Sequence, residues 1–135
     1  MKNLDTSGIG FSDMIDNDML YIDKTLLIDD ILRTNNRGVF LYTRPRRFGK
    51  TTNLSMLQEY FDVRRRGTHR FDGLAISRPE YSRHEVHRNA YNVVRIDLKG
   101  CNPRTYDSFI ESIGYIIAEV FGKQLDAIDR GSLTQ

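Results

Sequence analysis

Apolar residues recur at helical spacing in three stretches of the chain, 24–34, 50–63 and 106–126. The side chains expected to be buried are Leu27, Ile28, Ile31 and Leu32 in the first helix, Leu54, Leu57, Tyr60 and Phe61 in the second, and Phe109, Ile113, Ile116, Ile117 and Val120 in the third. Two shorter apolar runs, at residues 39–42 and 92–98, are rich in residues that favour strands.

These two runs decide the predicted fold class. The first run does not alternate clearly between apolar and polar residues, which is typical of a parallel strand in a sheet covered on both faces by helices. Each run leads into a predicted helix, so residues 38–63 are expected to hold a strand, a loop and a helix. The sequence therefore predicts an α/β fold, a three-layer sandwich with parallel strands.

The remaining segments show weaker patterns. Residues 1–22 are expected to be irregular, because their glycines favour turns. Residues 64–90 are polar and basic, and a helical turn near 69–74 is expected to anchor them to the core. The anchoring side chains would be Phe71, Leu74 and Ile76.

Length, net charge, cysteine count and apolar content indicate the class of protein and its location. The chain has 135 residues, which corresponds to one domain, and its net charge of +2 does not by itself indicate a nucleic-acid partner. Cys101 is the only cysteine, so no internal disulfide can form, as is typical of a reducing cytosol. No apolar run approaches the ~20 residues that span a membrane. The N-terminus lacks the apolar stretch of a signal peptide, and we expect a cytoplasmic protein without membrane contact.

The sequence YTRPRRFGKTT, at residues 42–52, lies between the first apolar run and the second helix. Its Gly49-Lys50-Thr51 matches the second half of the phosphate-loop pattern G-x-x-x-x-G-K-[ST], known as Walker A, but Arg44 stands where the first glycine belongs. A helix N-terminus offers free N–H groups and the positive end of its dipole to a phosphate. Lys50 is expected to contact the β- and γ-phosphates of ATP, and Thr51 to coordinate Mg²⁺. The predicted backbone cradle comprises Phe48, Gly49, Lys50, Thr51 and Thr52.

Arginines surround this loop and follow the second helix. Arg44, Arg46 and Arg47 are candidates to contact the phosphates, another domain or only solvent. Pro45 stiffens the loop by fixing its own φ and by restricting the residue before it. A second cluster, Arg64–Arg66 with Arg70, fits either a nucleic-acid backbone or the C-terminal end of a helix, where cations are favoured.

The histidines suggest no metal site. His69, His84, His87 and Cys101 are suitable ligand types, but they lack the tight paired spacing of a zinc site. We therefore expect solvated histidines in a loop.

Three motifs in order, YIDKT at 21–25, RPRRFGKT at 44–51 and FDGL at 71–74, resemble the landmarks of the AAA-ATPase-like domain family. The resemblance covers residues 8–121. It implies that the arginine-rich RPRRFGK replaces the usual glycine-rich opening, and that the chain has a P-loop α/β fold that binds ATP with Mg²⁺. Domains of this family often precede a C-terminal PD-(D/E)XK nuclease-like domain. YIDKT has two interpretations: it touches the nucleotide or closes over the loop, or it starts a helix with Asp23 as N-cap.

The resemblance also implies an acidic Walker B residue at the tip of a later strand, which holds Mg²⁺ and helps orient water. The sequence reaches Gln135 before such a strand, so residues 1–135 are expected to be the N-terminal part of an ATPase domain. ATP binding is expected, and hydrolysis by this chain stays open. Asp97 is a candidate magnesium ligand, although a solvent-facing or capping carboxylate fits its place better.

Two other functions compete with ATP binding. In one, the chain is a non-catalytic nucleic-acid-binding module that uses its arginine clusters. In the other, it is an inert truncated fragment that self-associates or pairs with a partner chain, because unpaired strand edges invite association.

Overall fold

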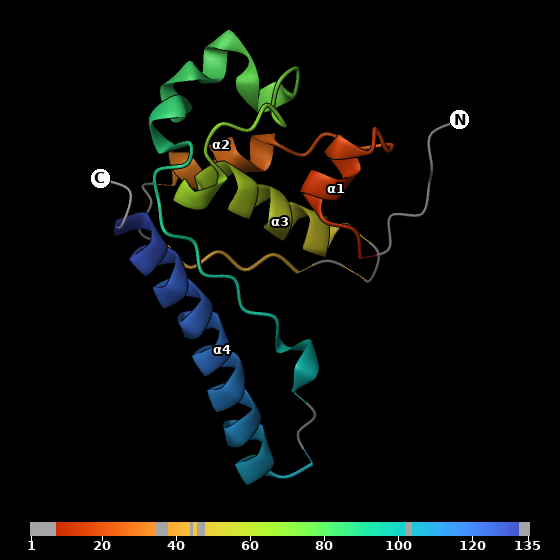
Figure 1. Ribbon diagram of the computed structural model, residues 1–135. Coiled ribbons are helices and arrows are strands. Elements are labelled where there is room, and N and C mark those ends of the chain that lie inside the picture. The colour runs from red at the N-terminus through yellow and green to blue at the C-terminus, as the bar shows by residue number, and fades with distance from the viewer. Residues whose placement is uncertain (1–7, 35–37, 44, 46–47, 102–103, 133–135) are drawn as a thin grey trace. The chain divides into compact units, whose positions relative to one another are not determined.

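The computed structural model describes all residues except 1–7, 35–37, 44, 46–47, 102–103 and 133–135 (Figure 1). The chain divides into two compact units, Met1–Val93 and Val94–Gln135, and each is described by itself. The α-helices are α1 (Phe11–Asp16), α2 (Leu26–Arg33), α3 (Lys50–Phe61) and α4 (Tyr106–Ser132). The 3₁₀ helices are η1 (Val63–Arg65), η2 (Ala75–Ser77), η3 (Pro79–His87) and η4 (Leu98–Gly100).

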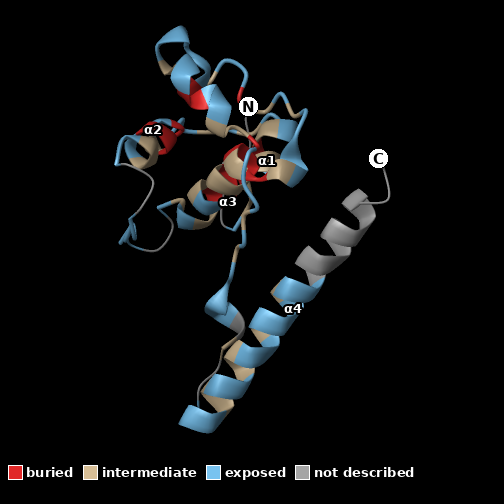
Figure 2. Ribbon diagram, turned by 90° about the vertical axis from the view of Figure 1, so that its left-hand side faces the viewer, coloured by how far each residue is buried: buried red, intermediate tan, exposed pale blue. Residues whose placement is uncertain are grey.

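The core of the first unit is built from α1, α2, α3 and the turn-rich segment that follows α3. One cluster of buried hydrophobic side chains in this core contains Phe11, Ile28, Met56, Tyr60, Phe71 and Ile76. The ring of Phe71 lies 5.0 Å from that of Phe11 and 5.2 Å from that of Tyr60, within the range in which aromatic pairs attract. Figure 2 shows buried positions on all three helices. The FDGL turn therefore supplies a central core residue, as the sequence predicts.

The three predicted helices are confirmed, but the buried face of α3 differs from the prediction. Its buried residues are Thr52, Ser55, Met56, Glu59 and Tyr60. Leu54, predicted to be buried, is 54% exposed. Polar groups can occupy the inner face because each has a hydrogen-bonding partner there, which removes the cost of burying them. Tyr60 is buried as predicted, and Leu57 and Phe61 are partly buried against the core. The apolar pattern thus misplaced Leu54 and did not reveal the buried polar positions.

The prediction of an α/β sandwich with parallel strands is wrong. The described residues contain no β-sheet, and their one isolated parallel bridge joins Asp62 to Tyr91. The run at 39–42 forms no strand, and its Val39 and Leu41 are 101% and 85% exposed. The run at 92–98 forms none either, and it ends in η4. Strand-forming residues stabilise a strand only through cross-strand pairs, and neither run makes such a ladder.

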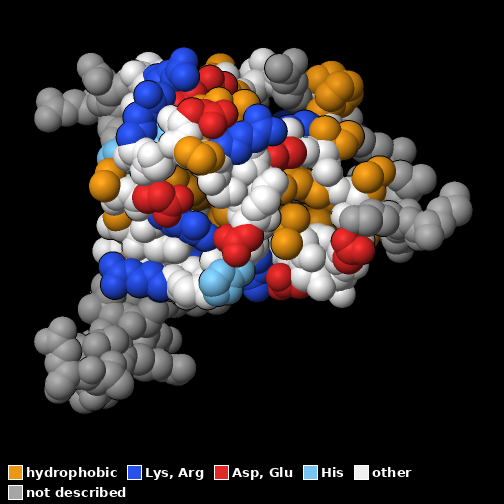
Figure 3. All heavy atoms as spheres, turned by 90° about the horizontal axis from the view of Figure 1, so that it is seen from above, with side chains coloured by type: hydrophobic (Ala, Val, Ile, Leu, Met, Phe, Trp, Pro, Cys, Tyr) orange, Lys and Arg blue, Asp and Glu red, His pale blue; other side chains and the backbone are white. Residues whose placement is uncertain are grey.

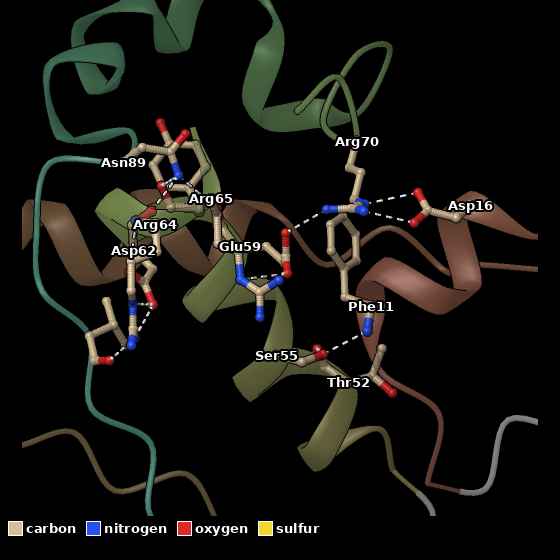
Figure 4. A network of polar contacts seen from close by, with 12 residues as sticks. Phe11, Asp16, Thr52, Ser55, Glu59, Asp62, Arg64, Arg65, Arg70 and Asn89 are labelled. Atoms are coloured by element: carbon tan, nitrogen blue, oxygen red, sulfur yellow. Dashed lines mark hydrogen bonds and ion pairs between the residues drawn. The ribbon is translucent and has the colours of Figure 1, made fainter. Parts of the chain in front are cut away.

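The N-terminal segment is more regular than predicted. Helix α1 lies within the supposedly irregular residues 1–22, and Phe11 at its start is fully buried. The Phe11 amide donates a hydrogen bond to Ser55 Oγ at 2.6 Å, and the Thr52 hydroxyl donates to the Ile9 carbonyl at 3.1 Å. These bonds attach α1 and the residues just before it to α3, and Figure 4 shows the bond between Phe11 and Ser55. A six-residue helix is too short to show a clear apolar period, which explains why the sequence did not reveal it.

In the second unit, α4 follows η4. At its start the Thr105 hydroxyl accepts a hydrogen bond from the Ser108 amide at 3.2 Å, in the manner of an N-cap. Of the predicted apolar stripe, Phe109, Ile113, Ile116 and Val120 are half-buried. Across the part of the chain that the structure describes, no helix is long and apolar enough to span a membrane.

Candidate functional site

The candidate site is the loop that leads into α3. Gly49, its last residue, adopts a left-handed φ of +73°, which residues with a side chain rarely do. A Cβ built on Gly49 would lie 3.4 Å from Lys24 Nζ. The first hydrogen bond of α3 runs from the Asn53 amide to the Gly49 carbonyl, at 2.8 Å. Amides in the first turn of a helix have no intrahelical acceptor, so they can receive an anion.

Two lysines place their ammonium groups against this loop. Lys50 Nζ donates to the Pro45 carbonyl at 2.8 Å. Lys24 Nζ, from the YIDKT motif, donates to the Phe48 carbonyl at 3.4 Å. Both side chains are exposed, as is Phe48. Among the described residues of this region, two lysines thus place ammonium groups beside the loop backbone, and both are exposed to solvent.

The two threonines of GKTT lie in different surroundings. Thr52 is buried, and its hydroxyl is engaged with the Ile9 carbonyl, so only its backbone amide is available to a phosphate. Thr51 is half-buried and remains the candidate ligand for Mg²⁺. The described residues contain no cluster of three or more His, Cys, Asp or Glu side chains that could hold a metal. Magnesium bound with a nucleotide takes most of its ligands from phosphates and water, and the hydroxyl of Thr51 would supply one protein ligand.

Three arginines and one aspartate were also predicted as ligands. Arg44, Arg46 and Arg47 fall outside the described residues. Asp97 belongs to the second unit, where its Oδ1 accepts a hydrogen bond from the Lys99 amide at 3.0 Å and caps η4. This geometry matches the capping role considered for Asp97, and its magnesium role stays a prediction.

The YIDKT motif links the start of α2 to the segment after FDGL. Asp23 Oδ1 accepts hydrogen bonds from the amide and hydroxyl of Thr25, at 2.8 and 2.7 Å. Asp23 Oδ2 accepts from the Ala75 amide at 2.7 Å, and Thr25 Oγ1 accepts from the Ile76 amide at 3.2 Å. Burial opposes ionisation of Asp23, but these donors outweigh it and hold its pKa below the ordinary range. The N-cap of α2 is Thr25, and Asp23 supports the helix start from two residues earlier.

A comparison of the whole chain with protein families finds one match. The model of the family described as predicted AAA-ATPase matches residues 7–130. The chain belongs to this AAA-ATPase-like family. The matched region includes the loop, both lysines and the YIDKT and FDGL motifs. No curated protein and no solved structure matches the chain significantly.

The second arginine cluster of this AAA-ATPase-like chain is engaged within the fold (Figure 4). Arg64 Nε donates to Asp62 Oδ1 at 2.9 Å, and Arg65 pairs with Glu59 at 3.3 Å. Arg70 bridges Asp16 at 2.8 Å and Glu59 at 2.9 Å. On the face seen in Figure 3, basic and acidic side chains alternate without forming one basic patch. The cluster therefore has a structural role in joining α1, α3 and the segment after α3.

His84 belongs to a buried polar cluster that the sequence does not predict. It is 5% exposed, and its Nε2 lies 2.7 Å from Asp29 Oδ1 on α2. Arg83 and Arg33 also contact this carboxylate, at 3.0 and 2.8 Å. The expectation of solvated histidines is thus wrong for His84, because the partner that justifies its burial lies 55 residues earlier. The available signal was Asp29 itself, an acid next to the apolar face of a predicted helix.

Proposed function

We propose that this AAA-ATPase-like chain binds ATP, together with Mg²⁺, at the loop that precedes α3. The observation that carries the proposal is the geometry at Gly49: a left-handed glycine at a helix N-terminus, with the ammonium groups of Lys24 and Lys50 on the carbonyls of the same loop. Membership of a family described as predicted AAA-ATPase supports the nucleotide class.

The residues have separate roles in this proposal. Lys50 exchanges the Pro45 carbonyl for the β- and γ-phosphates, because a phosphate oxygen is a stronger acceptor for an ammonium group than a neutral carbonyl is. Backbone amides from Phe48 to Thr52 surround the phosphates, and Gly49 keeps that backbone free of a side chain. Thr51 coordinates Mg²⁺, which neutralises part of the phosphate charge. Arg44, Arg46 and Arg47 are candidates for further phosphate contacts.

Nucleic-acid binding is the less supported function. Of the arginines proposed for that role, Arg64, Arg65 and Arg70 form ion pairs inside the first unit. Binding a phosphate backbone would require these pairs to break, at the cost of leaving the buried Glu59 and Asp62 without their partners. We also propose a cytoplasmic location, because ATP is available there.

The experiment is a titration of the chain with a fluorescent ATP analogue, with and without Mg²⁺. Wild type is compared with Lys50→Ala and with Lys99→Ala, an exposed lysine of the second unit that serves as the matched control. We expect saturable, Mg²⁺-dependent binding by wild type and Lys99→Ala, with loss of at least tenfold in affinity in Lys50→Ala. Equal binding by all three proteins, or binding by none, would overturn the proposal.

A further inference from the structure

We infer that Lys24 is a second phosphate-binding lysine of this site, acting beside Lys50. The inference rests on the proposed function and adds a ligand from outside the GKT sequence. It starts from the contact between Lys24 Nζ and the Phe48 carbonyl, and from the 3.4 Å that separates Nζ from the Cβ position of Gly49.

The fold holds the backbone of Lys24 in place on both sides. Asp23 before it is bonded to the Ala75 amide, and Thr25 after it is fully buried and bonded to the Ile76 amide. The amide of Lys24 itself donates to Tyr21 Oη at 3.4 Å. Anchors of this kind fix where the side chain begins, so the loop lies within reach of its ammonium group without a rearrangement of α2.

The contacts of Lys24 differ from those of five arginines in the same unit. Arg33, Arg64, Arg65, Arg70 and Arg83 each pair with a carboxylate. Among the described residues, Lys24 pairs with no carboxylate, and its one acceptor is a carbonyl at a long distance. An ammonium group carries three donors, so Lys24 can bind a phosphate oxygen and still touch the loop. Because no carboxylate in the described part of the chain neutralises it, the ammonium group of Lys24 is available to an anionic ligand.

A second lysine also has an electrostatic consequence. The phosphates of ATP carry more negative charge than the single phosphate of AMP, and each added cation near them strengthens binding of the more charged nucleotide. Lys24 should therefore raise affinity for ATP more than for AMP. A lysine that merely held the Phe48 carbonyl would affect both nucleotides alike.

The test measures competition by ATP, ADP and AMP against the fluorescent ATP analogue. The variants are Lys24→Gln, which removes the charge but keeps a donor for the Phe48 carbonyl, Lys24→Arg, which keeps the charge, and Lys99→Gln as the control. We expect Lys24→Gln to lower ATP affinity on the order of tenfold, to affect AMP less, and to leave the urea unfolding midpoint unchanged. Lys24→Arg should retain most of the preference for ATP over AMP.

The outcomes separate this inference from the proposed function. If Lys24→Gln binds ATP like wild type while Lys50→Ala loses it, the inference is overturned and the proposed function stands. Equal losses for ATP and AMP in Lys24→Gln would also overturn it, because they would indicate a role in holding the loop alone. If the wild type binds no nucleotide, both fail together.

Discussion

The carboxylate of Asp23 accepts a hydrogen bond from the amide of Ala75, 52 residues later in the chain. This bond joins the YIDKT motif to the segment that directly follows FDGL. Thr25, two residues after Asp23, makes the neighbouring bond to Ile76. Two motifs that look separate in the sequence thus form one structural connection, and Lys24 lies between its two anchor residues. This connection places the ammonium group of Lys24 at the loop, while Asp23 and Thr25 stabilise the core.

Replacement of Asp23 should therefore weaken the fold. Asp23→Ala leaves the Ala75 amide and the Thr25 amide and hydroxyl without their acceptor, and we expect it to lower the free energy of unfolding by about 2 kcal/mol. Urea denaturation followed by circular dichroism measures the change. Asp30→Ala, at an exposed position of α2, is the control and should change stability little. Equal effects of the two substitutions would show that the connection is not stabilising.

The buried carboxylate of Glu59 depends on Arg70. Glu59 is 3% exposed and pairs with Arg70 at 2.9 Å and Arg65 at 3.3 Å. Arg70→Met removes the closer partner, so we expect the free energy of unfolding to fall by about 3 kcal/mol. Adding Glu59→Gln to that variant should restore part of the loss, because it removes the uncompensated charge.

A double-mutant cycle over Arg70 and Glu59 measures this coupling. Arg104→Met, at an exposed position of the second unit, is the control for loss of an arginine. Simple addition of the two single effects would mean that the ion pair is energetically unimportant.

The side chain of Asn89 caps the C-terminal end of α3, although Asn89 lies 27 residues after Asp62 in the sequence. Its side-chain amide donates to the carbonyls of Glu59 and Asp62, at 3.0 and 2.9 Å, and its backbone has a left-handed φ of +50°. Both Asn89→Gly and Asn89→Ala lose these bonds. Only the alanine variant also carries the steric cost of a left-handed backbone, so it should be less stable than the glycine variant by about 1 kcal/mol. Thermal and urea unfolding compare the two, and equal stability would contradict this account of the backbone at Asn89.

Tyr60 makes stability sensitive to alkaline pH. Burial raises the pKa of its hydroxyl to about 12. Because the folded pKa lies above the unfolded value of about 10, the stabilising contribution is complete below pH ~10 and is lost as pH rises toward 12. Urea midpoints measured from pH 8 to 11 should fall above pH ~10 in wild type. The fall should be smaller in Tyr60→Phe, which removes only the hydroxyl that donates to the His84 carbonyl. The same fall in both proteins would assign it to other groups.

The sequence predicted the helices and the loop better than the way they pack. Helical spacing located α2 and α3 within a few residues, and GKT at the start of a helix located the candidate site. The polar part of the inner face of α3 was not predictable from apolar spacing, because Ser55 and Glu59 are buried through partners in α1 and after α3. Hydrogen bonds over such separations leave no local pattern.

The predicted strands failed for a related reason. Residues 39–42 have the composition of a strand, but a strand also needs a neighbour, and composition does not reveal whether one is present. His84 shows the same limit for a single residue, since only its distant partner Asp29 explains its burial. Lys24 was assigned to a motif from sequence, but the direction of its side chain required the fold.

The most direct test of the central claim is amide hydrogen exchange of the full chain with and without MgATP. We predict slower exchange in peptides that cover residues 45–53, because phosphate oxygens accept hydrogen bonds from amides at the N-terminus of α3. Peptides that cover η3 should exchange at the same rate in both conditions, since this segment lies outside the proposed site. Unchanged exchange at 45–53 under saturating MgATP, or protection found only elsewhere, would contradict the assignment of this loop as a nucleotide site.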